Sequence, residues 1–596
     1  MTSNLIRDTP FASWIDPDAW MESMKGPIWN KVLQEEESLV KSYTSLPQVK
    51  QRISKFTSIY KEQSKISLTS PPFIHNLVEI QWQSAFFKTW NFINNHKQTH
   101  TCRDILLTPT AVFCTVDIKD GEEYFELQCW TSPYATEPDW KLSPVGPDLG
   151  FVNNTLFYLG VEHKLMYYQV WSCDILGNNK KCIYLEQDTE VNLCIHRLAN
   201  KRCLVSRENS QDFLYYELPS LEPTKKYTDQ IPNLPIKEYG IDWIWPTHKF
   251  LITKEYNKKI LWDYSSSTSP KKLFTIEAGE ILVDPFAVWE NILPCLVIVN
   301  EPTGKSFYTL TKTSLTLINK ESNNLQTQVI HAISKDGTQV RGILTYKSKI
   351  NPKYILAIGY GSYGMSSPSS PVLTRWGPLI KTGWTILYTF VRGGGDHTES
   401  WAKAGRVEGR TKTIEDFEAL VQKAQGITNI PPINTAIYGR SAGGLLMGGS
   451  LANHPNGTLM SAVYAEVPYV DELRTTTNSD LPLTTLEHKE FGNPKASLKD
   501  FISVAMLSPA DTATILSTPK IFVLSRTAEH DSQVFTYEPV KWIRRLRNLV
   551  NKDAPKLCIV EKNQGHFTPP DLQLIQWAVD CALLDSWIHK ELPSMR

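Results

Sequence analysis

Ser441 lies in the stretch Gly439-Arg440-Ser441-Ala442-Gly443, between an apolar run and a helix-forming run. The pattern G-x-S-x-G is typical of a sharp strand-to-helix turn that presents a serine hydroxyl to a substrate. Glycines flank the serine because a tight turn leaves little room for Cβ atoms. The same pattern occurs in ordinary Gly/Ser loops. Assigning Ser441 as a nucleophile therefore requires a base, an orienting acid and oxyanion donors elsewhere in the chain.

A base and an acid follow the serine in the order that α/β-hydrolases use, which is Ser, then Asp or Glu, then His. We expect His566 to take the Ser441 proton and return it to the leaving amine. Asp531 follows an expected strand and is the first choice for the acid that orients the imidazole, with Glu529 as the second choice. The backbone N–H of Ala442, just past the nucleophile, is expected to donate to the developing oxyanion.

Two glycine-rich loops, at residues 359–364 and 392–396, precede the serine. Each follows an apolar run expected to be a strand. Both loops can therefore lie at the carboxyl edge of a parallel sheet, where ligands bind in α/β folds. Plain tight turns are the alternative interpretation. The phosphate-binding pattern G-x-x-x-x-G-K-[ST] is absent from the sequence, so these loops are not expected to bind nucleotides.

The elements that position these residues alternate between strands and helices from about residue 326 onward. A hairpin is expected around Asp336-Gly337. Strands are expected at 355–358, 385–390, 435–438, 462–464, 520–524 and 557–560, and helices at 414–424, 445–453, 537–550 and 571–592. This alternation predicts a mostly parallel, doubly wound sheet with both faces covered, an α/β-hydrolase-like catalytic domain over residues 326–596.

Residues 71–325 have a different character, with short β-rich runs separated by turn residues. This pattern predicts an all-β sandwich, barrel or propeller. About 40–45 residues per propeller blade would give roughly six blades. Residues 1–70 are expected to be mostly helical, with an amphipathic segment at 29–43 that acts as a packing arm. We expect no metal site or cofactor in any of the three regions.

The composition excludes several classes of function. The chain has 596 residues, with 62 Lys and Arg against 62 Asp and Glu, so its net charge is zero and no field favours nucleic acid or an anionic membrane. The apolar runs are too short to span a bilayer. The first eight residues have no apolar core, so we expect no secretory signal, a cytoplasmic location and ten reduced cysteines.

Motifs in the last 270 or so residues resemble the prolyl oligopeptidase family of serine peptidases, and within it the oligopeptidase B branch. They are YGSYG at 360–364, RGGGD at 392–396, GRSAGGLLMG at 439–448, VPYVD at 467–471, LTTLEHKEFGNP at 483–494, HDSQV at 530–534, EPVKW at 538–542 and GH at 565–566. The resemblance implies an α/β-hydrolase domain capped by a β-propeller, with short peptides as substrates. The early stretch WIDPDAW at 14–20 is similar to the N-terminal segment of the family.

The resemblance also implies roles for individual residues. Ser441, Asp531 and His566 fall on the catalytic triad positions of the family, and Tyr360 matches a tyrosine whose hydroxyl is the second oxyanion donor. The members called oligopeptidase B cut after Arg or Lys, and Glu487 stands at their main acidic position for that side chain.

The acidic pattern of this chain departs from that of the branch. Lys489 occupies a place where a further acid is common, which leaves Glu490 as the second substrate-binding candidate beside Glu487. The loop at 365–371 carries no carboxylate, although members of the branch can place two aspartates there. A preference for paired basic residues is therefore not expected.

The sequence supports a serine oligopeptidase as the leading hypothesis and leaves two alternatives. One is a non-catalytic interaction protein built on the propeller, with a vestigial hydrolase domain. The other is an esterase that uses the same catalytic residues. Reactivity of Ser441 separates the first alternative from the enzyme hypotheses, and relative turnover of an ester and an amide separates the second.

Overall fold

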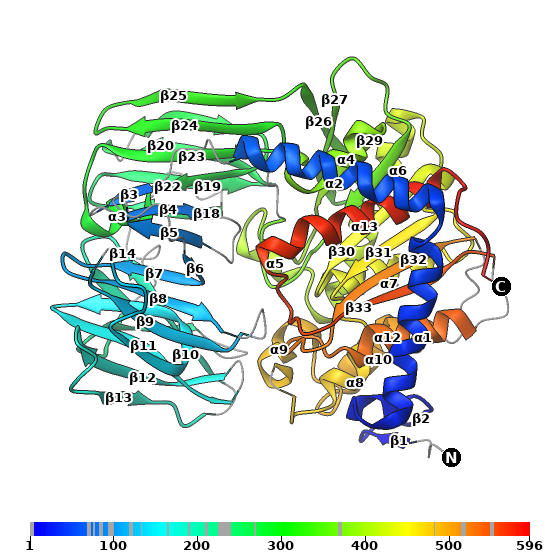
Figure 1. The fold of residues 1–596 in the computed structure, drawn as a ribbon, viewed down its shortest axis with the longest axis horizontal. Helices are drawn as coiled ribbons and strands as arrows, with labels where there is room; N and C mark the ends of the chain where they lie inside the picture. Colours follow the sequence, from blue (N-terminus) through cyan, green and yellow to red (C-terminus); the bar gives the residue numbers. More distant parts are fainter. Residues whose placement is uncertain are drawn as a thin grey trace.

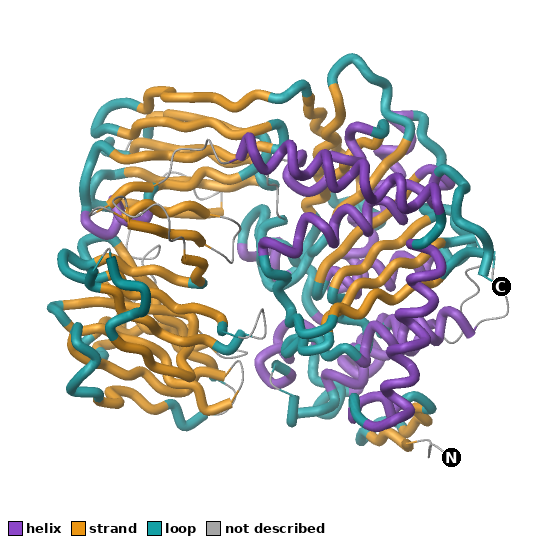
Figure 2. Tube along the Cα trace, in the orientation of Figure 1, coloured by secondary structure: helices purple, strands orange, loops and turns teal. Residues whose placement is uncertain are grey.

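The protein is described from a computed structural model of the chain. The structure describes residues 5–67, 73–75, 78–82, 88–92, 100–118, 123–132, 134–163, 166–188, 191–208, 213–224, 240–266, 270–367, 372–481, 483–513, 520–548 and 553–595. Strands gather in one half of the molecule, and helices surround a sheet in the other half (Figures 1 and 2).

The C-terminal half is built on one eight-stranded sheet of the order β26-β27-β29-β28-β30-β31-β32-β33. Its strands are β26 (Leu325–Ile333), β27 (Gln339–Lys347), β28 (Tyr354–Ile358), β29 (Trp384–Phe390), β30 (Thr435–Arg440), β31 (Ala462–Glu466), β32 (Phe522–Ala528) and β33 (Lys556–Glu561). The hairpin β26–β27 joins the sheet antiparallel through β29, and the pairs from β29 to β33 are parallel. The predicted hairpin and the predicted strands are confirmed.

Helices cover both faces of this sheet, which explains why its central strands are apolar throughout. The helices are α4 (Val372–Lys381), α5 (Glu399–Lys403), α6 (Arg410–Thr428), α7 (Gly443–Asn453), α8 (Glu472–Thr476), α9 (Thr484–Phe491), α10 (Leu498–Leu507), α11 (Pro509–Thr512), α12 (Tyr537–Asn548) and α13 (Pro570–Ile588). One apolar cluster lies between the sheet and α6, α7 and α12, and a second lies between the sheet and α4 and α13. Successive residues of β28 alternate between the two clusters, as the pleat requires.

The N-terminal segment packs on this half of the molecule. It contains β1 (Leu5–Asp8), β2 (Ser13–Asp16), η1 (Ala19–Ser23), α1 (Gly26–Thr44) and α2 (Pro47–Ser67). Helix α1 contacts the edge strand β33, and α2 lies against α13 and α4 (Figure 1). The predicted helical character is confirmed. The hairpin β1–β2 was not expected, because two four-residue strands carry too little periodicity to be recognised.

The β-rich half consists, in its described residues, of five consecutive antiparallel sheets. Their strands are β3 (Phe73–His75), β4 (Val78–Trp82), β5 (Lys88–Phe92) and β6 (His100–Cys102); β7 (Asp104–Leu107), β8 (Val112–Asp117), β9 (Phe125–Trp130), β10 (Trp140–Val152), β11 (Thr155–His163), β12 (Met166–Asp174) and β13 (Lys181–Leu185); β14 (Asn192–Leu198), β15 (Arg202–Glu208), β16 (Phe213–Leu218) and β17 (Glu222–Thr224); β18 (Gly240–Trp245), β19 (Phe250–Glu255), β20 (Lys258–Asp263) and β21 (Lys271–Ile276); β22 (Glu280–Val283), β23 (Cys295–Glu301), β24 (Gly304–Leu310) and β25 (Leu315–Ser322). Residues of β7, β10, β14, β18 and β22 line a common cavity of about 840 Å³.

One helix interrupts this region, α3 (Pro285–Glu290). Asp284 caps it, because its Oδ1 accepts hydrogen bonds from the backbone N–H groups of Phe286 and Ala287 at 3.0 and 3.3 Å. Pro285 suits the first helical position. The all-β prediction for residues 71–325 is therefore correct for the sheets and missed this single turn-and-a-half of helix.

The two halves meet through buried polar contacts. Asp396, fully buried in the second glycine-rich loop, accepts a hydrogen bond from Asn257 Nδ2 at 2.7 Å, and the Asn257 backbone N–H donates to the Asp396 carbonyl at 2.7 Å. Arg341 of β27 donates to Glu277 Oε2 at 2.7 Å. The β-rich half is thus fixed to a loop at the carboxyl edge of the eight-stranded sheet.

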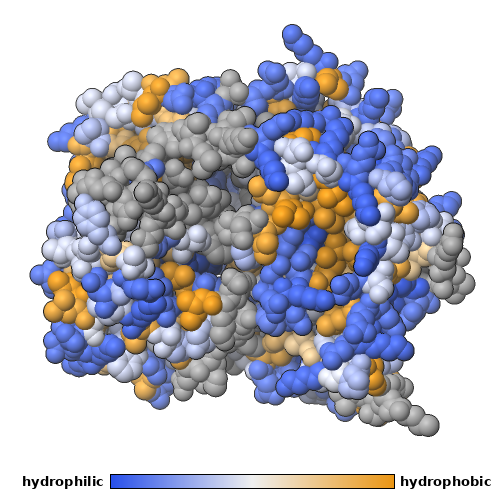
Figure 3. All heavy atoms as spheres, in the orientation of Figure 1, coloured by the Kyte–Doolittle hydropathy of each residue, from blue (hydrophilic) through white to orange (hydrophobic). Residues whose placement is uncertain are grey.

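The surface in view is mostly hydrophilic, with apolar side chains gathered in the region of α13 (Figure 3). No helix in the described part of the chain is both long and apolar enough to cross a membrane. None of the ten cysteines, all within the described residues, forms a disulfide.

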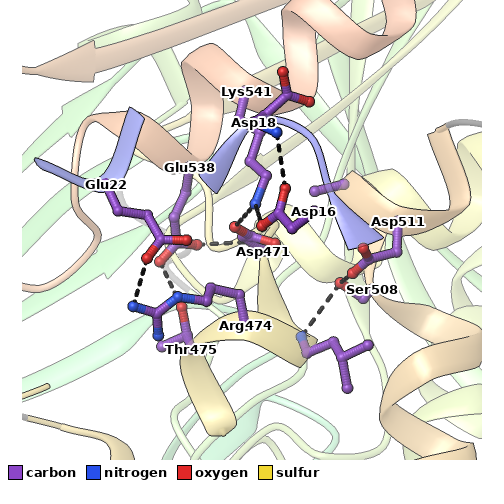
Figure 4. Close-up of polar contacts among 12 residues, drawn as sticks. Asp16, Asp18, Glu22, Asp471, Arg474, Thr475, Ser508, Asp511, Glu538 and Lys541 are labelled. Atoms are coloured by element: carbon purple, nitrogen blue, oxygen red, sulfur yellow. Dashed lines mark hydrogen bonds and ion pairs between the residues drawn. The ribbon is translucent and has the colours of Figure 1, made fainter. Parts of the chain in front are cut away.

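A buried ion-pair network joins the N-terminal segment to the C-terminal half (Figure 4). Lys541 Nζ, on α12, lies 2.7 Å from Asp16 Oδ2 and 2.7 Å from Asp471 Oδ2, and all three side chains are almost completely buried. Arg545 also binds Asp16, at 2.8 Å. Burial opposes ionisation of Asp16, but Lys541 and Arg545 together lower its pKa. The network holds the hairpin β1–β2 against the segment that follows β31.

We expect Lys541→Met to destabilise the protein by about 3–5 kcal/mol, because it leaves the Asp471 carboxylate buried without a cation. Urea-induced unfolding measures this loss. Lys562→Met is the matched control: its pair with Glu37 is exposed, so no measurable change is expected. Equal effects of the two variants would contradict the assignment.

Candidate active site

Ser441 lies in the sharp turn between β30 and α7, with a backbone φ of 53°. This left-handed conformation is rare for a residue with a side chain, and it turns the serine out at the carboxyl edge of the sheet. The Ser441 N–H donates to the Glu466 carbonyl at 2.9 Å, and the Ser441 carbonyl accepts from the Tyr469 N–H at 2.9 Å. The turn is therefore held by backbone bonds to the neighbouring strand β31 and the segment beyond it.

Glycines permit the close packing of this turn. A Cβ on Gly439 would lie 2.4 Å from the Gly443 carbonyl oxygen, and a Cβ on Gly444 would lie 2.6 Å from Pro468 Cβ. Contacts this short are not found for real Cβ atoms. The glycine pattern seen in the sequence thus has a steric cause at these positions.

Asp531 and His566 form a buried pair beside the turn. His566 Nδ1 lies 2.8 Å from Asp531 Oδ2, and the exposed fractions of the two residues are 2% and 3%. The other carboxylate oxygen, Oδ1, accepts from the backbone N–H groups of Gln533 and Val534 at 2.9 and 2.8 Å. Because the carboxylate can only accept, Nδ1 carries the proton and Nε2 is left as the basic nitrogen.

Glu529, the second choice for the orienting acid, lies elsewhere. Its Oε2 accepts a hydrogen bond from the Asn563 backbone N–H at 3.3 Å and makes no recorded contact with His566. The structure therefore brings Asp531, and not Glu529, to the imidazole.

No hydrogen bond between the Ser441 hydroxyl and His566 is recorded among the described residues. The two are connected through Arg440, whose guanidinium donates to the His566 backbone carbonyl. Catalytic hydrogen bonds are often long before substrate binds and shorten in the reactive complex. The arrangement is thus an assembled Asp–His pair with a serine positioned next to it.

Tyr360 lies at the end of β28, where the first glycine-rich loop begins, and packs against the apolar cluster that contains Ala442. Burial raises the pKa of Tyr360, and the charge of Arg440 opposes the shift. The phenol is therefore a neutral hydrogen-bond donor at neutral pH. Tyr360 thus packs against Ala442, the residue that follows the serine, while its hydroxyl donates to Met365 Sδ at 3.8 Å.

The two glycine-rich loops pack backbone against backbone. The Gly364 N–H donates to the Gly393 carbonyl at 2.9 Å, and the Gly395 N–H donates to the Met365 carbonyl at 2.8 Å. A Cβ on Gly395 would lie 1.9 Å from the Gly364 oxygen. The loops thus form a rigid floor at the carboxyl edge of the sheet. Residues 368–371 of the predicted carboxylate-free loop lie outside the described residues.

Glu487 and Glu490, both on α9, have different surroundings. Glu487 is half-buried and accepts a hydrogen bond from the Tyr363 hydroxyl at 2.5 Å. Burial raises the pKa of Glu487 to about 7, with a further contribution from the charge of Glu490 and an opposing one from the Tyr363 hydrogen bond. No cation within the described residues pairs with Glu487.

Glu490, in contrast, is already paired within the chain. Its oxygens lie 3.0 Å from Arg406 Nε and 2.9 Å from a terminal nitrogen of Arg410. It also accepts a hydrogen bond from the Tyr363 backbone N–H at 2.8 Å. The sequence placed Glu490 beside Glu487 as a substrate-binding carboxylate, whereas these contacts make it a link between α9, α6 and the first glycine-rich loop.

Sequence reasoning missed the contacts that reach this site from the β-rich half. Glu123, in the loop between β8 and β9, accepts a hydrogen bond from Gln533 Nε2 at 2.8 Å, two residues from Asp531. The Arg103 guanidinium lies 4.9 Å from the centre of the Phe567 ring, next to His566. Neither residue lies in a recognisable motif, so no signal in the sequence pointed to them.

Part of the chain matches a known protein family. Residues 374–590 match the prolyl oligopeptidase family. The chain is 32% identical to Protease 2 of Moraxella lacunata over 217 aligned residues. This alignment covers 36% of this chain and 30% of that protein. Over 266 residues it is 29% identical to the human protein called prolyl endopeptidase-like, covering 44% of this chain and 35% of the relative. The matched part thus spans about a third of the length of these curated relatives.

Solved structures show likeness over nearly the whole chain. Oligopeptidase B from Leishmania major superposes with a TM-score of 0.77 at 17% identity, covering 98% of this chain and 95% of that one. The closed form of oligopeptidase B from Trypanosoma brucei, with covalently bound antipain, gives a TM-score of 0.79 at 19% identity, covering 100% and 97%. At these identities the likeness shows the fold, which in both halves is that of the oligopeptidases.

We expect Gly439→Ala to destabilise the protein and to abolish the reactivity of Ser441, because the added Cβ collides with the Gly443 carbonyl oxygen. Thermal unfolding and hydrolysis of a p-nitrophenyl ester measure the two effects. Gly426→Ala, within α6, is the control: nothing lies within 4 Å of its Cβ position, and a gain of about 0.5–1 kcal/mol is expected. A Gly439→Ala variant with normal turnover would show that the turn is not constrained as described.

Proposed function

We propose that this chain, whose residues 374–590 belong to the prolyl oligopeptidase family, is a serine oligopeptidase that hydrolyses peptide bonds of short peptides. The observation that carries the proposal is the buried pair of His566 and Asp531, 2.8 Å apart, beside a serine in a left-handed turn. A base oriented by a third group and placed beside a serine is the arrangement that nucleophilic catalysis requires, which favours the enzyme over a vestigial domain.

The roles follow from the atoms available. Ser441 Oγ attacks the scissile carbonyl while His566 Nε2 takes its proton, and Asp531 holds the tautomer and stabilises the imidazolium. Tyr360 and the Ala442 N–H donate to the oxyanion of the tetrahedral intermediate. His566 then protonates the leaving amine, and water hydrolyses the acyl-enzyme by the reverse path. The Ser441–His566 hydrogen bond forms when substrate binds.

The β-rich half is proposed to act as a propeller-like cap, over residues 71–325, on a catalytic domain formed by residues 326–596 with residues 1–70 packed against it. Its contacts support this division, because Asn257 binds Asp396 and Glu123 reaches the loop of Asp531. A cap held at the carboxyl edge of the catalytic sheet admits extended peptides and excludes folded proteins.

We further propose that the enzyme prefers Arg or Lys on the acyl side of the cleaved bond. Glu487 supports this preference, because it lies on α9, whose Phe491 packs with Ala442, and because it pairs with no cation of the described chain. A carboxylate can accept two parallel hydrogen bonds from a guanidinium. Since Glu490 is occupied by Arg406 and Arg410, Glu487 is the acid available to a substrate in this proposal.

The role of Asp531 predicts a sharp contrast between neighbouring acids. Asp531→Asn is expected to lower kcat for a peptide amide by about 10⁴-fold, because the amide stabilises the wrong imidazole tautomer. Glu529→Gln, two residues away, is the matched control and should keep normal turnover. Comparable losses in both variants would contradict the assignment. Measuring the matching ester in parallel tests whether the enzyme is instead an esterase.

The pKa of Glu487, about 7, predicts the pH dependence of specificity. Below pH 7 the carboxyl is neutral, and above pH 7 it is an anion that attracts a guanidinium. The ratio of kcat/KM for an arginyl amide to that for the isosteric citrullyl amide should therefore rise between pH 6 and pH 8. Taking the ratio cancels every pH effect that the two substrates share.

Glu487→Gln is the control for this profile, and it should flatten the ratio at a low value while citrullyl turnover is kept. A ratio that does not change with pH in the wild type would refute the role of Glu487.

A further inference from the structure

Glu472, the first residue of α8, is a buried carboxyl group without a partner. Its exposed fraction is 2%, and no hydrogen bond or ion pair to either carboxyl oxygen is recorded among the described residues. Its Oε2 is completely inaccessible and unpaired. Buried carboxyl groups are almost always hydrogen-bonded, because burial without a partner is costly. The position of Glu472 therefore needs an explanation.

Glu472 faces the helix that carries Glu487. Helix α8 packs on α9, where the Thr484 hydroxyl donates to the Thr475 carbonyl at 2.8 Å. Glu472 lies three residues before Thr475, and Glu487 lies three residues after Thr484, so each is on the contacting face of its helix. The negative charge of Glu487 contributes to the raised pKa of Glu472, which agrees with this placement.

The charges around Glu472 leave it without a counterion. Burial raises the pKa of Glu472 to about 8, Arg410 opposes the shift, and Glu487 adds to it. Arg410 forms no hydrogen bond or ion pair with Glu472 among the described residues: its terminal nitrogens bind Glu490 at 2.9 Å and the Gly361 carbonyl at 2.7 Å, and its Nε has no hydrogen-bond partner. At neutral pH, Glu472 is therefore mostly protonated and lies near a second carboxyl group that is close to its own midpoint.

Aromatic rings pack between α9, which carries Glu487, and the segment bonded to Ser441. The Phe491 ring lies 5.0 Å from the Tyr469 ring and 5.5 Å from the Tyr363 ring, centre to centre. The Tyr469 hydroxyl is buried without a hydrogen-bond partner, and the backbone N–H of Tyr469 donates to the Ser441 carbonyl. Aromatic walls with carboxyl groups beyond them suit an apolar side-chain stem that ends in a cation.

We propose that Glu472 is a second specificity-determining carboxyl group, at the base of the site whose mouth is formed by Glu487, and that it releases its proton to solvent when a guanidinium or amidinium binds. This inference rests on the proposed preference for basic residues. In this inference Glu472 takes the role of a second acid, which the chain lacks at position 489 because a lysine stands there.

The competing explanation is that Glu472 only stabilises the start of α8. If that were its only role, replacing Glu472 would change the stability of the protein. It would not change the discrimination between cationic and neutral side chains, nor the number of protons released on binding. Those two quantities therefore separate the explanations.

The first test is calorimetric titration of the full chain with benzamidine at pH 7, in buffers of different ionisation enthalpy. The wild type should release protons on binding, to an extent that falls clearly in Glu472→Gln, with affinity about tenfold weaker. Glutamine matches the protonated carboxyl in shape, so the fold should be kept. Asp480→Asn, which removes an exposed acid from the segment joining α8 and α9, is the control and should behave like the wild type.

The second test is kinetic. Glu472→Gln should lower kcat/KM for an arginyl amide about tenfold and leave that for the citrullyl amide unchanged. Unchanged proton release and affinity in Glu472→Gln, or equal losses on both substrates, would overturn the inference. Failure of the proposed function is distinguishable, because it would appear as absent peptide hydrolysis by the wild type, while the benzamidine titration would still decide the role of Glu472.

Discussion

The left-handed backbone of Ser441 is the constraint on which the rest of the site depends. A residue with a side chain adopts φ of 53° only where surrounding contacts enforce it, and here β31 and the segment after it do so. The flanking glycines are required because the turn leaves no space for Cβ atoms at Gly439 and Gly444. Arg440, inside the turn, donates to the backbone carbonyl of His566 and so connects the turn to the loop that carries the histidine.

One segment serves both the nucleophile and the proposed substrate pocket. Residues 467–476 place Tyr469 against Ser441 and carry Glu472, and they are held from behind by buried charges (Figure 4). Lys541 pairs with Asp471, while Glu538 accepts from the backbone N–H groups of Val470 and Asp471. Burial raises the pKa of Glu538 to about 8, so one member of this dense acidic group is neutral at pH 7. The N-terminal hairpin completes the network through Asp16.

The sequence predicted those features of the site that depend on residues close together in the chain. The apolar runs and glycines around Ser441 predicted the strand, the turn and the helix, and the order of Asp531 and His566 predicted which loops meet. The partners of Glu490 could not be predicted, because Arg406 and Arg410 precede it by some 80 residues and only the fold brings them together. The same holds for Glu472, whose significance lies in a missing partner, and for Glu123, which reaches the site from the other half of the molecule.

The central claim is that Ser441 is an activated nucleophile, and the most direct measurement is covalent labelling with a fluorophosphonate followed by peptide mapping. The account predicts one adduct per chain, on Ser441, formed rapidly in the wild type and at least about 10³-fold more slowly in His566→Ala, because the base is lost. An adduct on a different serine, or equal labelling rates in the two proteins, would contradict it.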